Sequence, residues 1–178
     1  ARIGELAMDV VAVVCNHPAE ALVHTNLRDV PFHYLPVTRE TRPTAEARLL
    51  TLVRELDVEL VVLARYMQIL SDELSRDLSG RAINIHHSFL PAFKGANPYK
   101  QAYQRGVKLI GATAHYVTGD LDEGPIIEQE VARVEYNMRA EDLVALGRDV
   151  ECQALARAVR GHLEHRVFLN GQKTVVFR

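Results

Sequence analysis

The feature that most constrains the fold is the alternation of apolar, β-branched runs with segments of helical periodicity. Residues 8–15 read Met-Asp-Val-Val-Ala-Val-Val-Cys, and residues 58–65 and 82–86 are also mainly apolar. Continuous apolar runs are typical of strands that are buried on both faces. Residues 44–56 and 71–78 carry apolar positions at helical spacing. The alternation predicts an α/β fold with an open, mostly parallel sheet and helices on both faces.

The remaining elements complete this prediction. Thr44 and Ser71 are the expected caps of the two helices, because hydroxyl side chains accept hydrogen bonds from a helix's first N–H groups. A C-terminal β-hairpin is expected around Asn170-Gly171, a dipeptide that favours a tight turn. The other expected elements are strands over 31–37, 110–117 and 126–134, helices over 99–105 and 139–163, and the hairpin strands over 167–169 and 174–177.

Composition limits the class of protein. A length of 178 residues suits one domain, so we expect a single catalytic domain over 1–178. The net charge of -2 gives no basic surface for nucleic acid or an anionic membrane. The longest apolar stretch, 61–70, contains Arg65 and is too short to span a bilayer. The start of the chain lacks the apolar core of a signal peptide, and Cys15 and Cys152 read as reduced thiols of a cytoplasmic protein.

The strongest chemical signal is the run Asn84-Ile85-His86-His87-Ser88-Phe89-Leu90-Pro91, followed by Leu-Asp-Glu-Gly-Pro at 121–125. Asn84 and His86 are two positions apart on an expected strand, so their side chains share a face. An amide and a protonated imidazole can both donate to an oxygen that gains negative charge. Asp122 can hold the imidazolium, orient a water molecule or pass protons. These three residues therefore predict a site that hydrolyses or transfers an acyl group.

Other interpretations of these residues stay open. Asn84 and His86 can simply satisfy backbone groups at a strand end. A covalent mechanism through Ser88, with His86 and Asp122, lacks the Gly-x-Ser-x-Gly turn that exposes such a nucleophile. A metal site of His86, His87 and Asp122 is disfavoured, because neighbouring residues on a strand face opposite sides. We expect no metal.

A ligand site is expected beside these groups. Residues 67–70 leave the carboxyl end of an expected strand, where their backbone can read the polar edges of a flat ligand. Packing of the same residues in the core is an equally good interpretation, and so is packing of His115. No two glycines form a G-x-G pair, so neither a dinucleotide fingerprint nor a P-loop is present.

Taken together, these motifs resemble the folate-dependent formyl transferase and hydrolase family. The family pattern is Asn-x-His, then Ser-(Phe/Leu)-Leu-Pro and a Gly loop, and then Leu-Asp-x-Gly-Pro. Here it reads as residues 84–91, 94–96 and 121–125. Residues 64–70, 111–116 and 147–151 are also similar, and they point to the members that hydrolyse 10-formyltetrahydrofolate. The resemblance covers nearly the whole chain.

The resemblance implies a Rossmann-like formyltransferase fold with Asn84, His86 and Asp122 as the catalytic residues. The pterin ring of the folate would bind at the two segments around the cleft, namely Met67, Gln68, Ile69, Leu70, His115, Thr118, Gly119, Asp120 and Leu121. The implied reaction is hydrolysis of 10-formyltetrahydrofolate to tetrahydrofolate and formate, which balances one-carbon folate pools for purine biosynthesis. No separate cofactor is implied, because the folate is the substrate.

Two rival functions and two structural departures accompany this resemblance. A formyl transferase that acts on a small amine, such as glycinamide ribonucleotide, would use the same three residues. A folate-binding module without activity is the second rival. Relative to the family, we expect the chain to lack a first strand and helix and an upstream ACT-type regulatory domain. Association into a homo-oligomer is an open expectation.

Overall fold

The computed structural model describes residues 6–22, 27, 29–66, 68–87, 98–120 and 122–178. These residues fall into two compact units, Ala1–Glu59 and Leu60–Arg178. The expectation of a single catalytic domain therefore stays a prediction. No helix within the described ranges is long and apolar enough to cross a membrane.

The first unit contains a parallel strand pair and one long helix. Its elements are β1 (Val13–Cys15), the 3-10 helix η1 (Ala19–Leu22), β2 (Phe32–Tyr34) and α1 (Arg42–Glu55). The helix begins before the expected cap Thr44: Thr41 is the N-cap, and a proline occupies the first turn. Proline suits that position because the first N–H groups of a helix have no partner within it.

The expected strand over 8–15 is wrong in its extent and in its burial. Only Val13–Cys15 are in strand conformation, paired with Phe32–Tyr34. Val10, Val11 and Val14 are 44%, 40% and 38% exposed. Apolar sequence alone does not make a strand, because each residue also needs a partner strand for its backbone groups. The short β2 supplies partners for three residues of β1.

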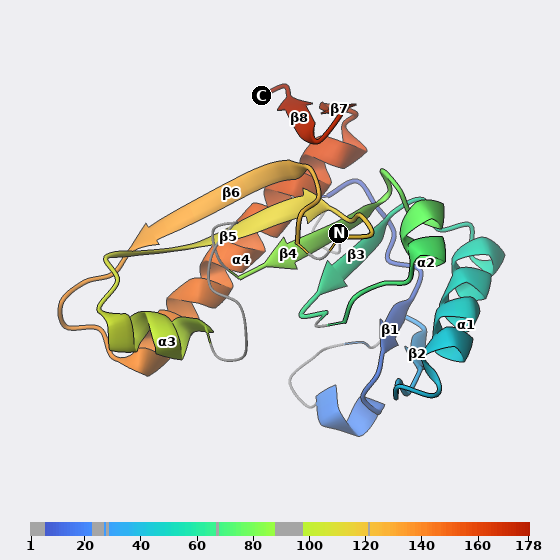
Figure 1. Ribbon diagram of the computed structural model, residues 1–178, viewed down its shortest axis with the longest axis horizontal. Coiled ribbons are helices and arrows are strands. Elements are labelled where there is room, and N and C mark those ends of the chain that lie inside the picture. The colour runs from blue at the N-terminus through green and yellow to red at the C-terminus, as the bar shows by residue number, and fades with distance from the viewer. Residues whose placement is uncertain (1–5, 23–26, 28, 67, 88–97, 121) are drawn as a thin grey trace. The chain divides into compact units, whose positions relative to one another are not determined.

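The second unit is built around a sheet with the strand order β3-β4-β5-β6. Figure 1 shows these strands side by side, with the C-terminal hairpin of β7 and β8 beyond them. The elements are β3 (Val61–Ala64), α2 (Asp72–Asp77), β4 (Ala82–His86), α3 (Pro98–Arg105), β5 (Leu109–Tyr116), β6 (Ile126–Arg133), α4 (Ala140–Leu163), β7 (Val167–Asn170) and β8 (Lys173–Val176).

The strand directions confirm the α/β class and show that this sheet is mixed. β3 and β4 run parallel and are joined through α2, as expected for a βαβ unit. Ser71 caps α2 as predicted, since its Oγ accepts a hydrogen bond from the backbone N–H of Leu74 at 3.3 Å. β4 and β5 are antiparallel, and so are β5 and β6. The C-terminal hairpin is also confirmed, although its loop is Gly171-Gln172 because Asn170 still pairs with Lys173.

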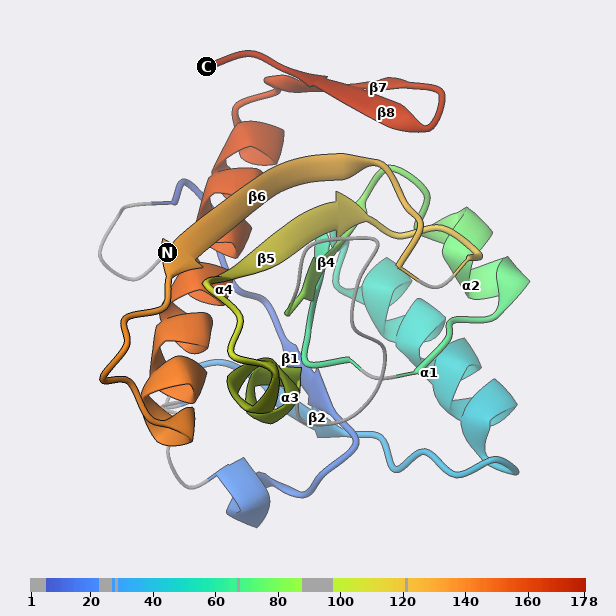
Figure 2. The same cartoon turned by 60° about the vertical axis from the view of Figure 1, so that its left-hand side comes forward.

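One long helix covers a face of this sheet. α4 packs across β4, β5 and β6 (Figure 2). Its buried side includes Leu143, Val150 and Ala154. The strand β5 is buried from Ile110 to Tyr116. Because β4 lies between β3 and β5 and is itself largely buried, polar side chains near its carboxyl end are held firmly.

Candidate active site

The carboxyl end of β4 positions the first two candidate residues. Asn84 pairs with Leu63 on one side and with His115 on the other, and His86 pairs with Thr113. Ile83 and Ile85 alternate with them and are buried at 0% and 9% exposure. The alternation of side chains along β4 therefore places Asn84 and His86 on one face, as predicted from their spacing.

The loop between β5 and β6 brings Asp122 to the same place. Asp122 has a positive φ of 57°, a backbone conformation that aspartate adopts more readily than most residues. Gly124 then passes so close to β5 that an added Cβ would lie 1.7 Å from the backbone oxygen of Tyr116. The glycine of the Leu-Asp-Glu-Gly-Pro motif thus allows the close approach that turns the Asp122 carboxylate toward β4.

The three candidate catalytic residues meet at Asp122. Nδ1 of His86 lies 3.2 Å from Oδ2 of Asp122. Nδ2 of Asn84 donates a hydrogen bond to Oδ1 of Asp122 at 3.4 Å. The carboxylate therefore contacts both candidates, as the sequence predicted.

His115 completes the cluster from β5. Its Nδ1 lies 2.8 Å from the backbone oxygen of Tyr116, and its Nε2 lies 3.3 Å from Nδ2 of Asn84. Because a carbonyl oxygen only accepts, Nδ1 carries the proton and Nε2 of the neutral ring accepts from Asn84. The NH2 group of Asn84 is thus engaged by Asp122 and His115. Its Oδ1 is buried and has no hydrogen-bond partner among the residues that the structure describes.

Burial governs the charge of the two histidines. Loss of hydration lowers the pKa of His86, and the Asp122 carboxylate opposes that effect, while His87 and His115 add to it. Loss of hydration also lowers the pKa of His115, against its backbone hydrogen bond and Asp122. Both imidazoles are therefore mainly neutral near pH 7, and His86 has a carboxylate beside it that can stabilise a proton gained during a reaction.

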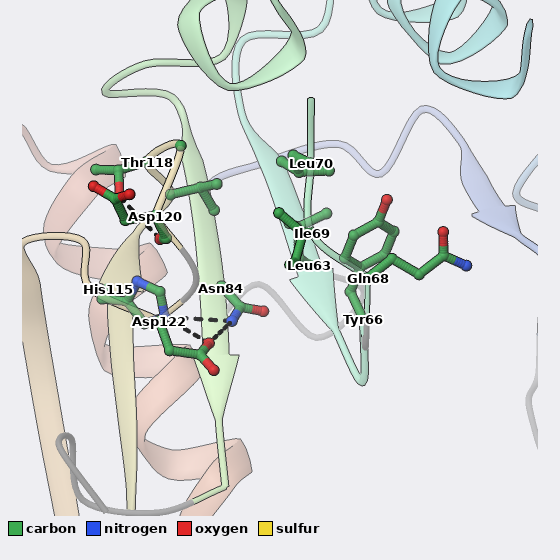
Figure 3. Close-up of a pocket in the computed structure, with 12 residues that line it drawn as sticks. Leu63, Tyr66, Gln68, Ile69, Leu70, Asn84, His115, Thr118, Asp120 and Asp122 are labelled. Atoms are coloured by element: carbon green, nitrogen blue, oxygen red, sulfur yellow. Dashed lines mark hydrogen bonds and ion pairs between the residues drawn. The ribbon is translucent and has the colours of Figure 1, made fainter. Parts of the chain in front are cut away.

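A pocket opens beside this cluster and contains most of the predicted ligand residues. Figure 3 shows Asn84, His115 and Asp122 meeting on one side, while the Gln68 carboxamide points away from them. Of the predicted ligand residues, Met67 and Leu121 lie outside the described residues, and the others all line the pocket: Gln68, Ile69, Leu70, His115, Thr118, Gly119 and Asp120.

Sequence reasoning missed three lining residues and the orientation of one histidine. Leu63, Tyr66 and Val117 also line the pocket. Tyr66 and Val117 directly precede the two predicted segments, and Leu63 lies four positions before the first one. Extending both segments back into their strands would have included all three residues. The expectation that His87 faces away from His86 is wrong: the two rings stack with centroids 4.7 Å apart. Alternation stops where the strand stops, and β4 ends at His86.

The structure bears differently on the covalent serine mechanism and on the metal site. Ser88 lies outside the described residues, so the covalent serine mechanism is not tested. In the described part of the chain, no group of three or more His, Cys, Asp or Glu side chains is arranged to hold a metal ion.

The family model and the curated relatives that match this chain agree with one another. The family model described as "Formyl transferase" matches residues 1–159. The chain is 56% identical to formyltetrahydrofolate deformylase of Corynebacterium sp. (strain P-1), over 98% of this chain and 61% of that protein. The corresponding protein of Bacillus subtilis is 52% identical over 98% of this chain and 58% of its own length. The chain thus spans about three fifths of the length of these curated relatives.

Solved structures match closely as well. The crystal structure of formyltetrahydrofolate deformylase from Burkholderia mallei has a TM-score of 0.91 and 59% identity, and the match covers 99% of this chain and 63% of that one. Phosphoribosylglycinamide formyltransferase from Anaplasma phagocytophilum has a TM-score of 0.85 and 31% identity, with coverages of 98% and 85%. The same fold therefore occurs in proteins named as hydrolases and in proteins named as transferases.

Proposed function

The chain belongs to the formyl transferase family, and on that premise we propose that it hydrolyses 10-formyltetrahydrofolate to tetrahydrofolate and formate. The observation that carries the proposal is the contact of Asp122 with both His86 and Asn84, at 3.2 Å and 3.4 Å, beside an open pocket. The relatives named formyltetrahydrofolate deformylase, 44–56% identical to this chain, support hydrolysis over transfer.

The proposed reaction uses the His86–Asp122 pair to move one proton. Water attacks the formyl carbon, and the pair accepts the proton that the water loses. The protonated imidazole, stabilised by the Asp122 carboxylate, donates to the oxyanion of the tetrahedral intermediate. When the C–N bond breaks, the proton passes to the departing nitrogen. Formic acid and the secondary amine of tetrahydrofolate leave, and the acid ionises to formate by releasing its proton to solvent.

Asn84 is proposed to orient the reacting groups. In the resting protein its NH2 group holds Asp122 and contacts His115, and its buried Oδ1 accepts from none of the described residues. A buried acceptor without a partner is unfavourable, so an N–H of the substrate or a water molecule gains from binding there. We therefore assign Asn84 to the orientation of the reacting groups, with donation to the oxyanion if its amide turns during the reaction.

The pterin ring is proposed to bind in the pocket next to this cluster. Apolar side chains of Leu63, Ile69 and Leu70 line one part of it, while backbone groups of 118–120 offer fixed donors and acceptors. Flat heterocycles suit such a lining. Formyltetrahydrofolate is consumed in this reaction, so no separate cofactor is proposed. We expect the reaction to occur in the cytoplasm and to serve purine biosynthesis.

One assay tests the proposal directly. The purified protein is incubated with 10-formyltetrahydrofolate in the absence of any amine, and formate and tetrahydrofolate are measured. Formation of both products in equal amounts is the expected result. Tight folate binding without any product from folded protein would leave only the folate-binding module.

A further inference from the structure

A second buried cluster lies next to His86, on α3 and α4, and the proposed reaction does not use it. Tyr99 is 9% exposed, and its hydroxyl donates a hydrogen bond to Oε1 of Glu151 at 2.5 Å. Burial raises the pKa of Tyr99, and its hydrogen bond to Glu151 raises the pKa further. The phenol therefore stays protonated and donates to Glu151.

Gly147 makes room for the tyrosine ring. A Cβ added at Gly147 would lie 2.1 Å from Cζ of Tyr99. Gly147 and Glu151 are four positions apart on α4, so they share one face of the helix. That face supplies a gap for the ring and an acceptor for its hydroxyl. The orientation of Tyr99 is therefore fixed by two residues of another helix.

His87 connects this cluster to the candidate catalytic histidine. Its ring stacks on His86, with centroids 4.7 Å apart and planes 22° apart. The His87 ring also lies near the Tyr99 ring, with centroids 6.4 Å apart and ring planes 59° apart. Burial lowers the pKa of His87, against the charges of Glu151 and Asp122. His87 thus contacts the proposed chemistry through His86 and the second cluster through Tyr99.

We propose that His87 is a positioning residue for His86. The Tyr99–Glu151 pair, for which Gly147 leaves room, holds His87 in place. The second torsion of a histidine side chain is broad, so packing must select the ring orientation. Asp122 contacts Nδ1 of His86. Stacking on His87 fixes the plane of the ring and thereby the direction of its other nitrogen. This inference rests on the proposed function, because hydrolysis is where the orientation of His86 matters.

Kinetics of matched variants test the proposal. Tyr99→Phe removes the hydroxyl, and Gly147→Ala pushes the ring aside. We expect each to lower kcat about 10-fold to 100-fold, the scale for a displaced reacting group, while KM stays within about twofold. None of these residues lines the folate pocket. Equal losses in kcat and in folate affinity would overturn the proposal, because they would indicate general damage to the fold.

Each variant has a control on the same helix. Tyr103→Phe removes a hydroxyl on α3 from a residue that is 46% exposed. Gly161→Ala adds a Cβ to α4 where the nearest side-chain atom is Val167 Cγ2 at 3.2 Å. We expect both controls to keep wild-type kcat. A second pair separates shape from chemistry: His87→Phe retains a ring that can stack, so it should keep much more of kcat than His87→Ala does. Equal losses for both His87 variants would also overturn the proposal.

A measurement without turnover separates this inference from the proposed function. The ring resonances of His86 are recorded by NMR in the wild type, in Tyr99→Phe and in Tyr103→Phe. We expect the first variant to shift them and the control to leave them in place. If the wild type forms no formate, the proposed function fails while this comparison still decides the coupling. Unmoved His86 resonances in Tyr99→Phe would refute the coupling even in an active enzyme.

Discussion

At the scale of single residues, the contacts of Asp122 make the strongest prediction. His86→Ala removes the proton carrier, and Asp122→Asn removes the charge that stabilises the protonated imidazole. Each change should lower kcat by at least about 100-fold, the scale for losing an acid–base or oxyanion partner. Asn84→Ala should lower kcat similarly, with less effect on folate binding. Steady-state formate release and equilibrium folate binding measure these effects.

Two exposed residues serve as controls for these variants. His165→Asn and Asp149→Asn change the same residue types within Leu60–Arg178, where both side chains are exposed and neither lines the pocket. They should leave turnover unchanged. A folded His86→Ala protein with near wild-type turnover would show that the proposed mechanism is wrong.

The pKa of His86 gives a second prediction at this scale. Burial lowers it, and the Asp122 carboxylate opposes that effect. The wild-type ring should therefore titrate below the ordinary histidine value of about 6.5. Because the neutral form accepts the proton, kcat/KM should rise with pH through this pKa and then level off. In Asp122→Asn the opposing charge is gone, so an NMR titration should find the pKa lower still; a higher value would contradict this account.

Gln68 provides a prediction of small effect. Its side chain lines the pocket but points away from Asn84, His115 and Asp122 (Figure 3). We propose that backbone groups of this segment, rather than the Gln68 carboxamide, read the pterin ring. Gln68→Ala should therefore change KM and kcat little in the formate assay. A large rise in KM would identify the carboxamide as a main reader of the ring.

At the scale of elements, the loop between β5 and β6 depends on Gly124. An added Cβ would lie 1.7 Å from a backbone oxygen of β5, which no rotamer change can relieve. Gly171 is the control: its φ is +62° and no atom lies within 4 Å of an added Cβ. Gly171→Ala should lower the free energy of unfolding by about 1–2 kcal/mol through backbone strain alone. Gly124→Ala should lower it by more, measured by urea denaturation, and should also reduce kcat by displacing Asp122.

Element by element, the sequence predicted most where local rules decide the structure. The strand over 82–86 is observed with the predicted bounds, and the alternation along it predicted that Asn84 and His86 share a face. The strand over 8–15 was overestimated, because the length of a strand depends on a partner that its own sequence does not reveal. The stack of His86 on His87 was missed, because alternation ends with the strand.

Contacts between segments that are distant in the sequence could not be predicted, because they depend on how the helices and strands pack together. Tyr99 meets Gly147 and Glu151 only because α3 and α4 pack together. Nothing near Tyr99 in sequence indicates that a glycine far along the chain makes room for its ring. Similarly, the antiparallel placement of β5 beside β4 follows from the path of the chain rather than from the composition of either strand.

At the scale of the whole molecule, a hydrolase differs from a transferase in whether water or an amine receives the formyl group. The chain resembles solved structures of both kinds, with TM-scores of 0.91 and 0.85. A transferase must hold an amine where a hydrolase holds water. The resemblance noted in the sequence implies that the transferases usually carry a proline after the histidine that matches His86. A proline would fix the backbone and remove an N–H, whereas His87 supplies a ring that stacks on His86. We propose that this local difference shapes the site for water.

The last prediction follows from that difference. With 10-formyltetrahydrofolate alone, the protein should release formate, and adding glycinamide ribonucleotide should neither raise the rate of folate consumption nor yield a formylated product. Mass spectrometry of the ribonucleotide and an assay of free formate measure the two fates of the same formyl group. A solved transferase of the family, assayed in parallel, should give the reverse partition. Stoichiometric transfer to the amine, with negligible formate, would assign this chain to the transferases, because the formyl group can leave by only one of the two routes in each turnover.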